Sequence, residues 1–258
     1  MTTRFIGLDL AWSPANNTAG VALEAEQGLA KWAEHREQLG DDDQVLAFIH
    51  EAAAGHPAFV AIDAPLIVPN ETGARPVDRE ITRPFGRYDA GCYPANPLRG
   101  CARGEDIVAA LANSGFQHNP YVTRRAATHS VFEVYPHPAM VALFNLDKTL
   151  KYRAGRRRSM AFQRRELSRL RSHLLGLHHG GPAMTISCKV VNCDTCTLRG
   201  RAFKRYEDLL DAAMCAYIAY FAWYWGPESY DVYGDTSQGY NLVPITKQMR
   251  TRLAPHLG

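Results

Sequence analysis

Acidic residues recur at the ends of apolar segments in this chain, where a charge is costly to bury. Asp9 lies in FIGLDLAW, Asp63 in FVAIDAPL and Glu133 in SVFEVYPHPA. Asp208 and Asp211 come near the start of the long apolar segment YEDLLDAAMCAYIAYFAWYW, and their spacing of three places them on one face of a helix. A carboxylate in a buried strand is unfavourable unless another charge compensates it. Its repetition in separate segments predicts that the carboxylates converge, and converging carboxylates usually bind a divalent metal.

Each of these acids also has a structural explanation when it is taken singly. Asp9 could cap a turn, and Asp63 precedes Ala-Pro, which suits a turn as well. Asp208 could favour the positive end of a helix dipole. His137 lies four residues after Glu133 and could carry a proton beside a metal, or it could be a packing residue.

Basic residues form two further candidate groups. Arg75 and Arg79 lie with Asp78 in the loop after Asp63, where they could contact phosphate or form a local salt-bridged turn. The segment from residue 151 to residue 171 has nine Lys or Arg residues and one acid, so it carries +8 in a chain whose net charge is +3. Such an excess is a footprint for phosphate groups, although a solvated helix face has the same composition. The predicted phosphate contacts in it are Arg156, Arg157 and Arg158.

Three cysteines have a spacing that resembles part of a zinc motif. Cys188, Cys193 and Cys196 read C-x4-C-x2-C, with two histidines upstream. Structural zinc needs four ligands, usually as two close pairs, and this segment supplies one close pair and an outlier. We therefore expect no complete zinc site here.

The order of the predicted elements would position the acids. Apolar patterns predict strands at residues 4–12, 18–25 and 29–37, a helix at 41–54 and a buried strand at 58–64 closed by a proline. That order implies an antiparallel meander whose first strand has a parallel neighbour. Residues 65–129 read as loop-rich with one helix at 104–114. A strand follows at 130–135, helices at 138–144, 160–177 and 206–225, and a short strand at 239–245.

Six segments resemble a family of predicted nucleases, domain of unknown function 429, in the ribonuclease H-like superfamily. They are GLDLAW, AIDAPL, RPVDRE, EVYPH, the D-x-x-D helix followed by A-x-x-A-Y-I-A, and GYNLVP, and they span residues 6–244. The resemblance implies an α/β fold with a mixed five-stranded sheet of order 3-2-1-4-5 flanked by helices. It also implies a single domain over residues 1–258, with insertions at about 66–129 and 147–203.

In ribonuclease H-like nucleases, acids at such positions hold two divalent ions. By this resemblance Asp9 is the central ligand, Asp63 or Glu133 is a second, and Asp208 or Asp211 completes the set. The D-x-x-D spacing is similar to that of the final acids of Holliday-junction resolvases. Mg²⁺ and Mn²⁺ are the expected ions because they prefer oxygen ligands. Two of them ~4 Å apart can activate water and stabilise the leaving oxygen of a phosphodiester.

The resulting expectation is a metal-dependent nuclease that acts on DNA or RNA. A phosphoryl-transfer enzyme of related fold is an alternative, although no G-x-x-x-x-G-K-[ST] loop is present. A catalytically inactive nucleic-acid-binding or scaffold domain is another. The N-terminal segment shows no secretory signal pattern, the longest apolar run is short for a membrane span, and six cysteines without such a signal suggest the cytoplasm. Oligomeric state, and endo- versus exonuclease action, are left open.

Overall fold

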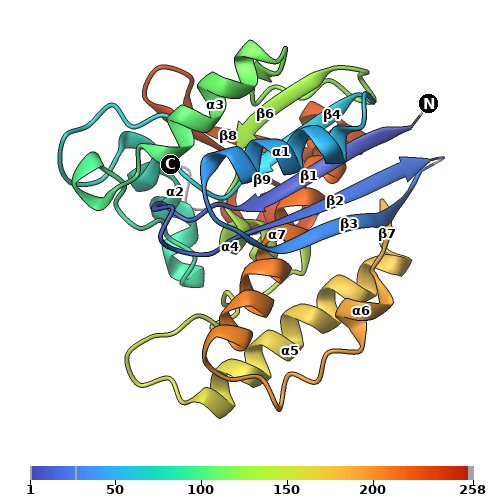
Figure 1. Ribbon diagram of the computed structural model, residues 1–258. Coiled ribbons are helices and arrows are strands. Elements are labelled where there is room, and N and C mark those ends of the chain that lie inside the picture. The colour runs from blue at the N-terminus through green and yellow to red at the C-terminus, as the bar shows by residue number, and fades with distance from the viewer. Residues whose placement is uncertain (1, 27, 255–258) are drawn as a thin grey trace.

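The central sheet of the computed structural model is covered by helices on both faces (Figure 1). The structure describes residues 2–26 and 28–254, without the side chains of residues 188 and 189. The strands are β1 (Thr3–Asp9), β2 (Thr18–Glu26), β3 (Leu29–Leu39), β4 (Ala58–Ile62), β5 (Gln117–His118), β6 (His129–Glu133), β7 (Ala183–Thr185), β8 (Tyr230–Asp235) and β9 (Gly239–Pro244). The helices are α1 (Asp42–Ala53), α2 (Pro76–Phe85), α3 (Arg103–Asn113), α4 (Pro136–Leu143), α5 (Met160–Gly176), α6 (Cys188–Val191), α7 (Gly200–Trp225) and α8 (Lys247–Leu253).

The main sheet has seven strands in the order β5-β6-β4-β1-β2-β3-β7. β1, β2 and β3 form the predicted antiparallel meander, and β4 pairs in parallel with β1. β6 continues the parallel side beyond β4. The prediction of an α/β fold is therefore confirmed. The sheet is longer than the predicted five strands because β5 and β7 add short edge strands of two and three residues.

Two hydrophobic cores lie on the two faces of the sheet. α1 and α3 cover one face, where Ile6, Leu8 and Phe48 are among the buried side chains. The long helix α7 lies across the other face with α4 beside it, and α5 packs against α7 (Figure 1). Residues of opposite parity in the strands supply the two cores, as the alternation of side chains along a strand requires.

A glycine in β1 allows α7 to lie directly on the sheet. A Cβ atom built on Gly7 would lie 2.1 Å from the backbone oxygen of Ala212 and 2.2 Å from the backbone nitrogen of Ala216. No real side chain tolerates such distances, so the strand and helix backbones meet here only because residue 7 is glycine. This contact brings the N-terminal half of α7 beside the end of β1.

One helix was missed in the region predicted to be loop-rich. α2 starts with Pro76 at its first turn, and Val77, Ile81 and Phe85 are buried along one face. Pro76 and Pro84 hide this periodicity in the sequence. A proline is nevertheless well tolerated in the first turn of a helix. α7 begins six residues before the predicted start at 206. None of the helices in the described part of the chain is long and apolar enough to cross a membrane.

Candidate active site

Three of the predicted acids converge at the edge of the sheet where parallel strands end. Asp9 is the last residue of β1, and Asp63 follows the last residue of β4. The backbone N–H of Asp63 donates to the carbonyl of Leu8 at 2.9 Å, which fixes the two strand ends side by side. Asp211 approaches from α7, and its side chain is fully buried. The structure thus brings Asp9, Asp63 and Asp211 to the same edge of the sheet.

A guanidinium group lies in the middle of these acids. The Nη2 atom of Arg153 is 2.7 Å from Asp211 Oδ2, 3.3 Å from Asp63 Oδ2 and 3.7 Å from Asp9 Oδ1. Arg153 comes from the loop between α4 and α5, and a third of its side chain remains exposed. The preceding residue, Tyr152, is buried and donates its hydroxyl to Asp211 Oδ1 at 2.5 Å. One cation thus joins carboxylates from three separate segments.

Burial raises the pKa of two carboxyl groups in this cluster. The pKa of Asp63 rises to about 7 because burial disfavours its charge, which the Arg153 guanidinium offsets only in part. The pKa of Asp9 rises well above its usual range for the same reason, with added repulsion from the neighbouring acids. The pKa of Arg153 rises although burial opposes it, because three carboxylates favour its charge. The cluster is therefore short of positive charge near neutral pH.

Asp208 forms a second polar group one helical turn from Asp211. Its Oδ2 atom accepts from Asn17 Nδ2 at 2.9 Å, and its Oδ1 atom accepts a hydrogen bond from the ammonium of Lys204. The charge of Asp208 is thus balanced within α7 and by the β1–β2 loop. A role in the helix dipole is not its main one, because it lies in the third turn of α7 and not in the first.

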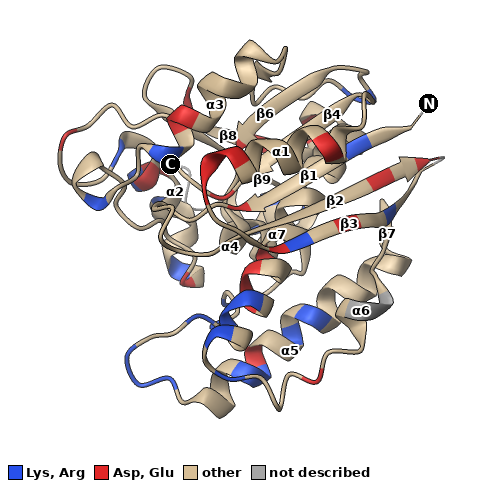
Figure 2. Cartoon of the chain, in the orientation of Figure 1, with Lys and Arg blue, Asp and Glu red and all other residues tan. Residues whose placement is uncertain are grey.

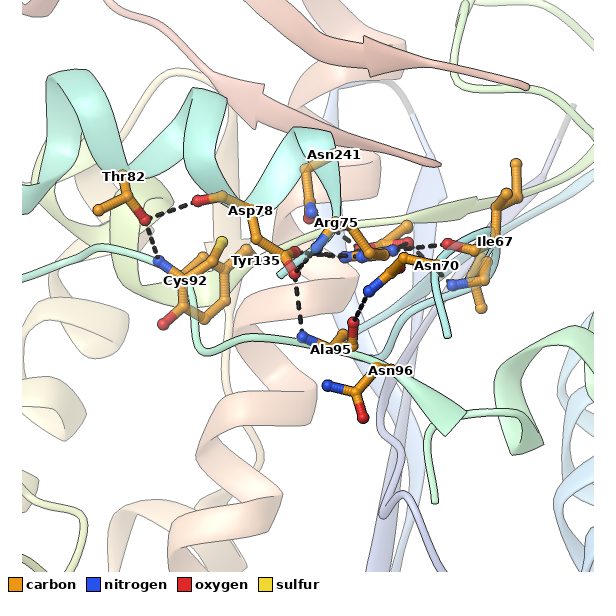
Figure 3. Close-up of polar contacts among 12 residues, drawn as sticks. Ile67, Asn70, Arg75, Asp78, Thr82, Cys92, Ala95, Asn96, Tyr135 and Asn241 are labelled. Atoms are coloured by element: carbon orange, nitrogen blue, oxygen red, sulfur yellow. Dashed lines mark hydrogen bonds and ion pairs between the residues drawn. The ribbon is translucent and has the colours of Figure 1, made fainter. Parts of the chain in front are cut away.

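Glu133 belongs to a separate buried network. Its carboxylate accepts from Arg75 at 2.6 and 2.9 Å, from the backbone N–H of Leu66 at 2.8 Å and from Asn241 Nδ2 at 2.8 Å. The guanidinium of Arg75 also donates to Asp78 at 3.0 and 3.1 Å, and Figure 3 shows these contacts. Arg75 and Asp78 thus form the salt-bridged turn that the sequence offered as an alternative to phosphate binding. Glu133 is committed to Arg75, whereas Asp63 faces the acid cluster.

A pocket of about 590 Å³ joins the two polar groups. Its walls include Asp9, Asp63, Asp208, Glu133 and Arg153, and the buried Asp211 contacts Arg153 without lining the pocket. The mouth carries aromatic residues from two loops, Trp12 and Tyr93. The lining thus combines acidic and aromatic side chains, with Arg99 and Lys204 as further cations.

The remaining predicted residues lie outside this pocket. His137 is buried in α4, its Nδ1 atom is 3.1 Å from the Thr149 hydroxyl, and its pKa falls to about 4 because of burial and the nearby Arg153 charge. A neutral, buried imidazole matches the packing role offered by the sequence. Arg79 is exposed on α2. Arg156 and Arg157 are exposed in the loop before α5, and Arg158 donates to the carbonyl of Arg153 at 3.0 Å.

The basic segment is divided between two roles. Figure 2 shows Lys and Arg residues along the loop between α4 and α5 and on α5 itself. Arg164 donates to the carbonyl of Leu198 at 2.7 Å, and Arg169 pairs with Glu166 at 2.9 Å. These side chains of α5 have local partners, so the loop offers the exposed positive charge. Cys193 and Cys196 are free, and the side chain of Cys188 lies outside the described residues, so the zinc expectation stays a prediction.

Sequence reasoning did not single out Arg153, Lys204 or Asn241. Arg153 was counted only as one of nine basic residues. Tyr152 beside it was a usable signal, because an aromatic side chain buries a large area when the chain meets the core. Lys204 lies four residues before Asp208, a spacing that favours an ion pair on a helix.

Divalent ions suit the chemistry of the converging acids. Asp9, Asp63 and Asp211 supply carboxylate oxygens only, which is the donor set that Mg²⁺ and Mn²⁺ prefer. In the conformation described, with Arg153 between them, no three Asp, Glu, His or Cys side chains of residues 2–26 and 28–254 form a group that could hold one ion. The acids therefore fit such an ion by donor type, while in this conformation Arg153 is their counter-ion.

The chain matches the family model described as protein of unknown function (DUF429) over residues 7–237. That match covers most of the chain, including all of the converging acids, so this protein belongs to the family. No curated protein and no solved structure gives a significant match.

Proposed function

We propose that this protein is a divalent-metal-dependent nuclease of ribonuclease H-like architecture. The observation that carries the proposal is the convergence of Asp9, Asp63 and Asp211 from β1, β4 and α7 on a single cation. The meander β1-β2-β3, with β4 and β6 added in parallel beside β1, supports the architecture. Structural acids are normally paired locally, whereas these three come from residues more than 50 apart in the chain.

Asp9, Asp63 and Asp211 would hold the metal, with Asp208 one helical turn away. Bound Mg²⁺ or Mn²⁺ would supply Lewis acidity and lower the pKa of a water nucleophile. Glu133 would act at a distance, because with Arg75 it fixes the loop that follows Asp63 through the N–H of Leu66.

Basic side chains of the protein would bind and orient the substrate. Arg153, Lys204 and Arg99 line the pocket, and cations placed around a carboxylate cluster can orient a phosphodiester and offset its charge. Arg156 and Arg157, exposed on the adjacent loop, would extend this positive surface to neighbouring phosphates. A displaced Arg153 would remain close enough, on its own loop, to contact the substrate.

One observation favours a second candidate, a non-catalytic nucleic-acid-binding domain. Arg153 already neutralises part of the acid cluster, so it could serve as a permanent counter-ion in place of a metal. The phosphoryl-transfer alternative has no comparable support in the pocket.

A cleavage assay separates the two candidates. Single-stranded, duplex, hybrid and branched oligonucleotides would be incubated with Mg²⁺, Mn²⁺ or a chelator, using wild type, Asp9→Asn and the exposed-site control Glu71→Gln. The proposal requires metal-dependent cleavage that Asp9→Asn loses and Glu71→Gln keeps. The absence of such cleavage across the whole panel would leave the binding domain as the better explanation.

A further inference from the structure

An exposed tyrosine stands at the mouth of the acidic pocket on a firmly held loop. The side chain of Tyr93 is 72% exposed, yet Tyr93 lines the pocket. An aromatic ring held in solvent beside a polar pocket is available to contact a ligand, because a tyrosine combines a large apolar face with a polar tip.

The loop cannot easily fold this ring away, because its backbone is fixed on both sides of Tyr93. On one side the N–H of Cys92 donates to the Thr82 hydroxyl at 3.0 Å. On the other side the N–H of Ala95 donates to Asp78 at 3.0 Å, and the Ala95 carbonyl accepts from Asn70 at 3.0 Å (Figure 3). The exposure of Tyr93 is therefore built into the fold.

The carboxylate that holds this loop belongs to the buried network of Arg75. Asp78 receives two hydrogen bonds from the Arg75 guanidinium, whose other partner is Glu133 at the end of β6. The hydroxyl of Tyr135, just beyond β6, also donates to the carbonyl of Gly91 at 3.1 Å. The loop that carries Tyr93 is thus tied to the same strand end that borders the pocket.

A second aromatic residue and an unpaired cation complete the mouth. Trp12, in the β1–β2 loop, lines the pocket and is half-buried. The two loops adjoin, because a Cβ built on Gly100 would lie 3.8 Å from the Trp12 carbonyl oxygen. Arg99, one residue earlier, is exposed, lines the pocket and makes no ion pair within the described residues.

The pocket wall also presents an acceptor without a donor. Asn241 is 2% exposed and its Nδ2 atom donates to Glu133, but its Oδ1 atom has no hydrogen-bond partner among the described residues. Because the Glu133 carboxylate accepts, the amide orientation is fixed and Oδ1 must be the free atom. Leaving a buried acceptor of this kind unpaired is costly.

We propose that Tyr93 and Trp12 form a stacking site for an unpaired base of a single-stranded nucleic acid, with Arg99 on the adjoining phosphate. The inference rests on the proposed nuclease function and names its substrate class. Base stacking on aromatic rings beside a basic groove is the common basis of single-strand recognition.

A duplex fits this pocket poorly. Both faces of a base inside a duplex are already stacked, so an aromatic ring gains nothing without displacing a neighbour. The side chains of Asp9 and Asp63 are only 14% and 13% exposed, so the acids are recessed below the mouth. A single strand can bend its backbone toward recessed acids while one base stacks at the rim.

The test is a binding experiment that does not depend on cleavage. A single-stranded oligonucleotide with one 2-aminopurine, the same strand in a duplex, and 2-aminopurine nucleoside monophosphate would be titrated with protein in a chelator. Variants would be Tyr93→Ala, Tyr93→Phe, and Tyr121→Ala as the matched control, since Tyr121 is 60% exposed but does not line the pocket. We expect quenched fluorescence and tight binding for the single strand. Tyr93→Ala should weaken binding by about ten-fold or more, whereas Tyr93→Phe and Tyr121→Ala should not.

Other outcomes would overturn the stacking site. They are equal binding of duplex and single strand, wild-type affinity in Tyr93→Ala, or a mononucleotide that binds as tightly as the strand. Cleavage with Mn²⁺, measured separately, decides the nuclease proposal. If the protein cleaves and Tyr93→Ala binds as well as wild type, the nuclease proposal stands and the stacking site is wrong. If the base stacks and no cleavage occurs, the stacking site stands and the nuclease proposal is wrong.

Discussion

Arg153 and Asp211 form an ion pair of 2.7 Å although they belong to a loop and a helix 58 residues apart. The same guanidinium nitrogen reaches Asp63 at 3.3 Å, so Arg153 occupies the place between the carboxylates that a divalent ion would need. Under the proposed function, a metal would have to compete with this cation of the protein itself. In the metal-free protein, Arg153 reduces the repulsion among the acids. Metal binding can therefore be tested by replacing this single residue.

Replacing Arg153 should lower apo stability and strengthen metal binding. Arg153→Gln removes the counter-ion of buried acids, which costs about 3–5 kcal/mol when a fully buried pair is broken. Because Arg153 is a third exposed and the acids can take up protons, we expect about 1–3 kcal/mol here. Mn²⁺ should then raise the melting temperature more in Arg153→Gln than in wild type. The exposed neighbour Arg156→Gln serves as the control, and an equal Mn²⁺ response in all three proteins would contradict competition.

The carboxyl of Asp63 should make stability depend on pH. Its pKa is about 7 in the folded protein and ~3.9 in an unfolded chain, so folding favours its protonated form. In the absence of metal, this group makes the protein progressively less stable as pH rises from about 4 to about 7. Asp63→Asn should remove that part of the slope, and Glu71→Gln should keep it. Chemical denaturation at a series of pH values measures the difference, and parallel curves for wild type and Asp63→Asn would refute it.

The affinity for a metal should also depend on the ionisation of Asp63, but it should increase with pH whereas stability decreases. A metal needs the carboxylate form, so Mn²⁺ affinity should rise as pH increases through about 7. Calorimetric titration at pH 6 and at pH 8 would check this expectation. Tighter binding at the lower pH would exclude Asp63 as a ligand.

Asp9→Asn should abolish cleavage while leaving the fold intact. Loss of a ligand shared by two ions should cost about three orders of magnitude in rate, or roughly 4 kcal/mol of transition-state stabilisation. The apo protein should be as stable as wild type or more so, because the substitution removes a buried charge and its repulsion by neighbouring acids, and these two effects raise the pKa of Asp9. Rate and melting temperature measured on one preparation separate a lost ligand from a lost fold, since a fall in both would point to misfolding.

Gly7→Ala should damage the site through packing alone. The added methyl group would lie about 2 Å from the α7 backbone, so strand and helix must separate. Overpacking typically costs about 1–3 kcal/mol, and the upper end applies because backbone atoms cannot rotate away. The expected result is lower stability and a weaker Mn²⁺ response, with Gly55→Ala as a comparison because its Cβ would meet nothing within 4 Å. Wild-type stability in Gly7→Ala would show that the helix does not pack as described.

Gly55 itself has a φ of +73°, so the stability lost in Gly55→Ala measures backbone strain without a steric clash. Any loss in Gly7→Ala beyond that of Gly55→Ala measures the separation of α7 from β1. The metal response of Gly55→Ala should equal that of wild type, because Gly55 lies at the end of α1, away from the acids.

The amino-acid sequence by itself determined the elements and the position of most acids within them. Periodicity and turn residues are local properties, so β1, β4, α1 and the core of α7 could be predicted within a few residues. Because Asp9 and Asp63 end neighbouring parallel strands, their proximity followed from strand order alone. The helix α2 was missed because proline normally argues against a helix. Its prolines are tolerated because of where they lie in the helix.

The tertiary structure alone decided which charges pair. Glu133 and Asp63 end adjacent strands and look equivalent in sequence, yet Glu133 is bound by Arg75 and Asp63 faces Arg153. Similarly, only the adjacent Tyr152 distinguishes Arg153 locally from the eight other basic residues of its segment. Ion pairs between distant segments depend on how loops cross the sheet edge and on which carboxylates are desolvated there. Such pairings form only when the chain has folded, because burial and long-range contact together set their free energy.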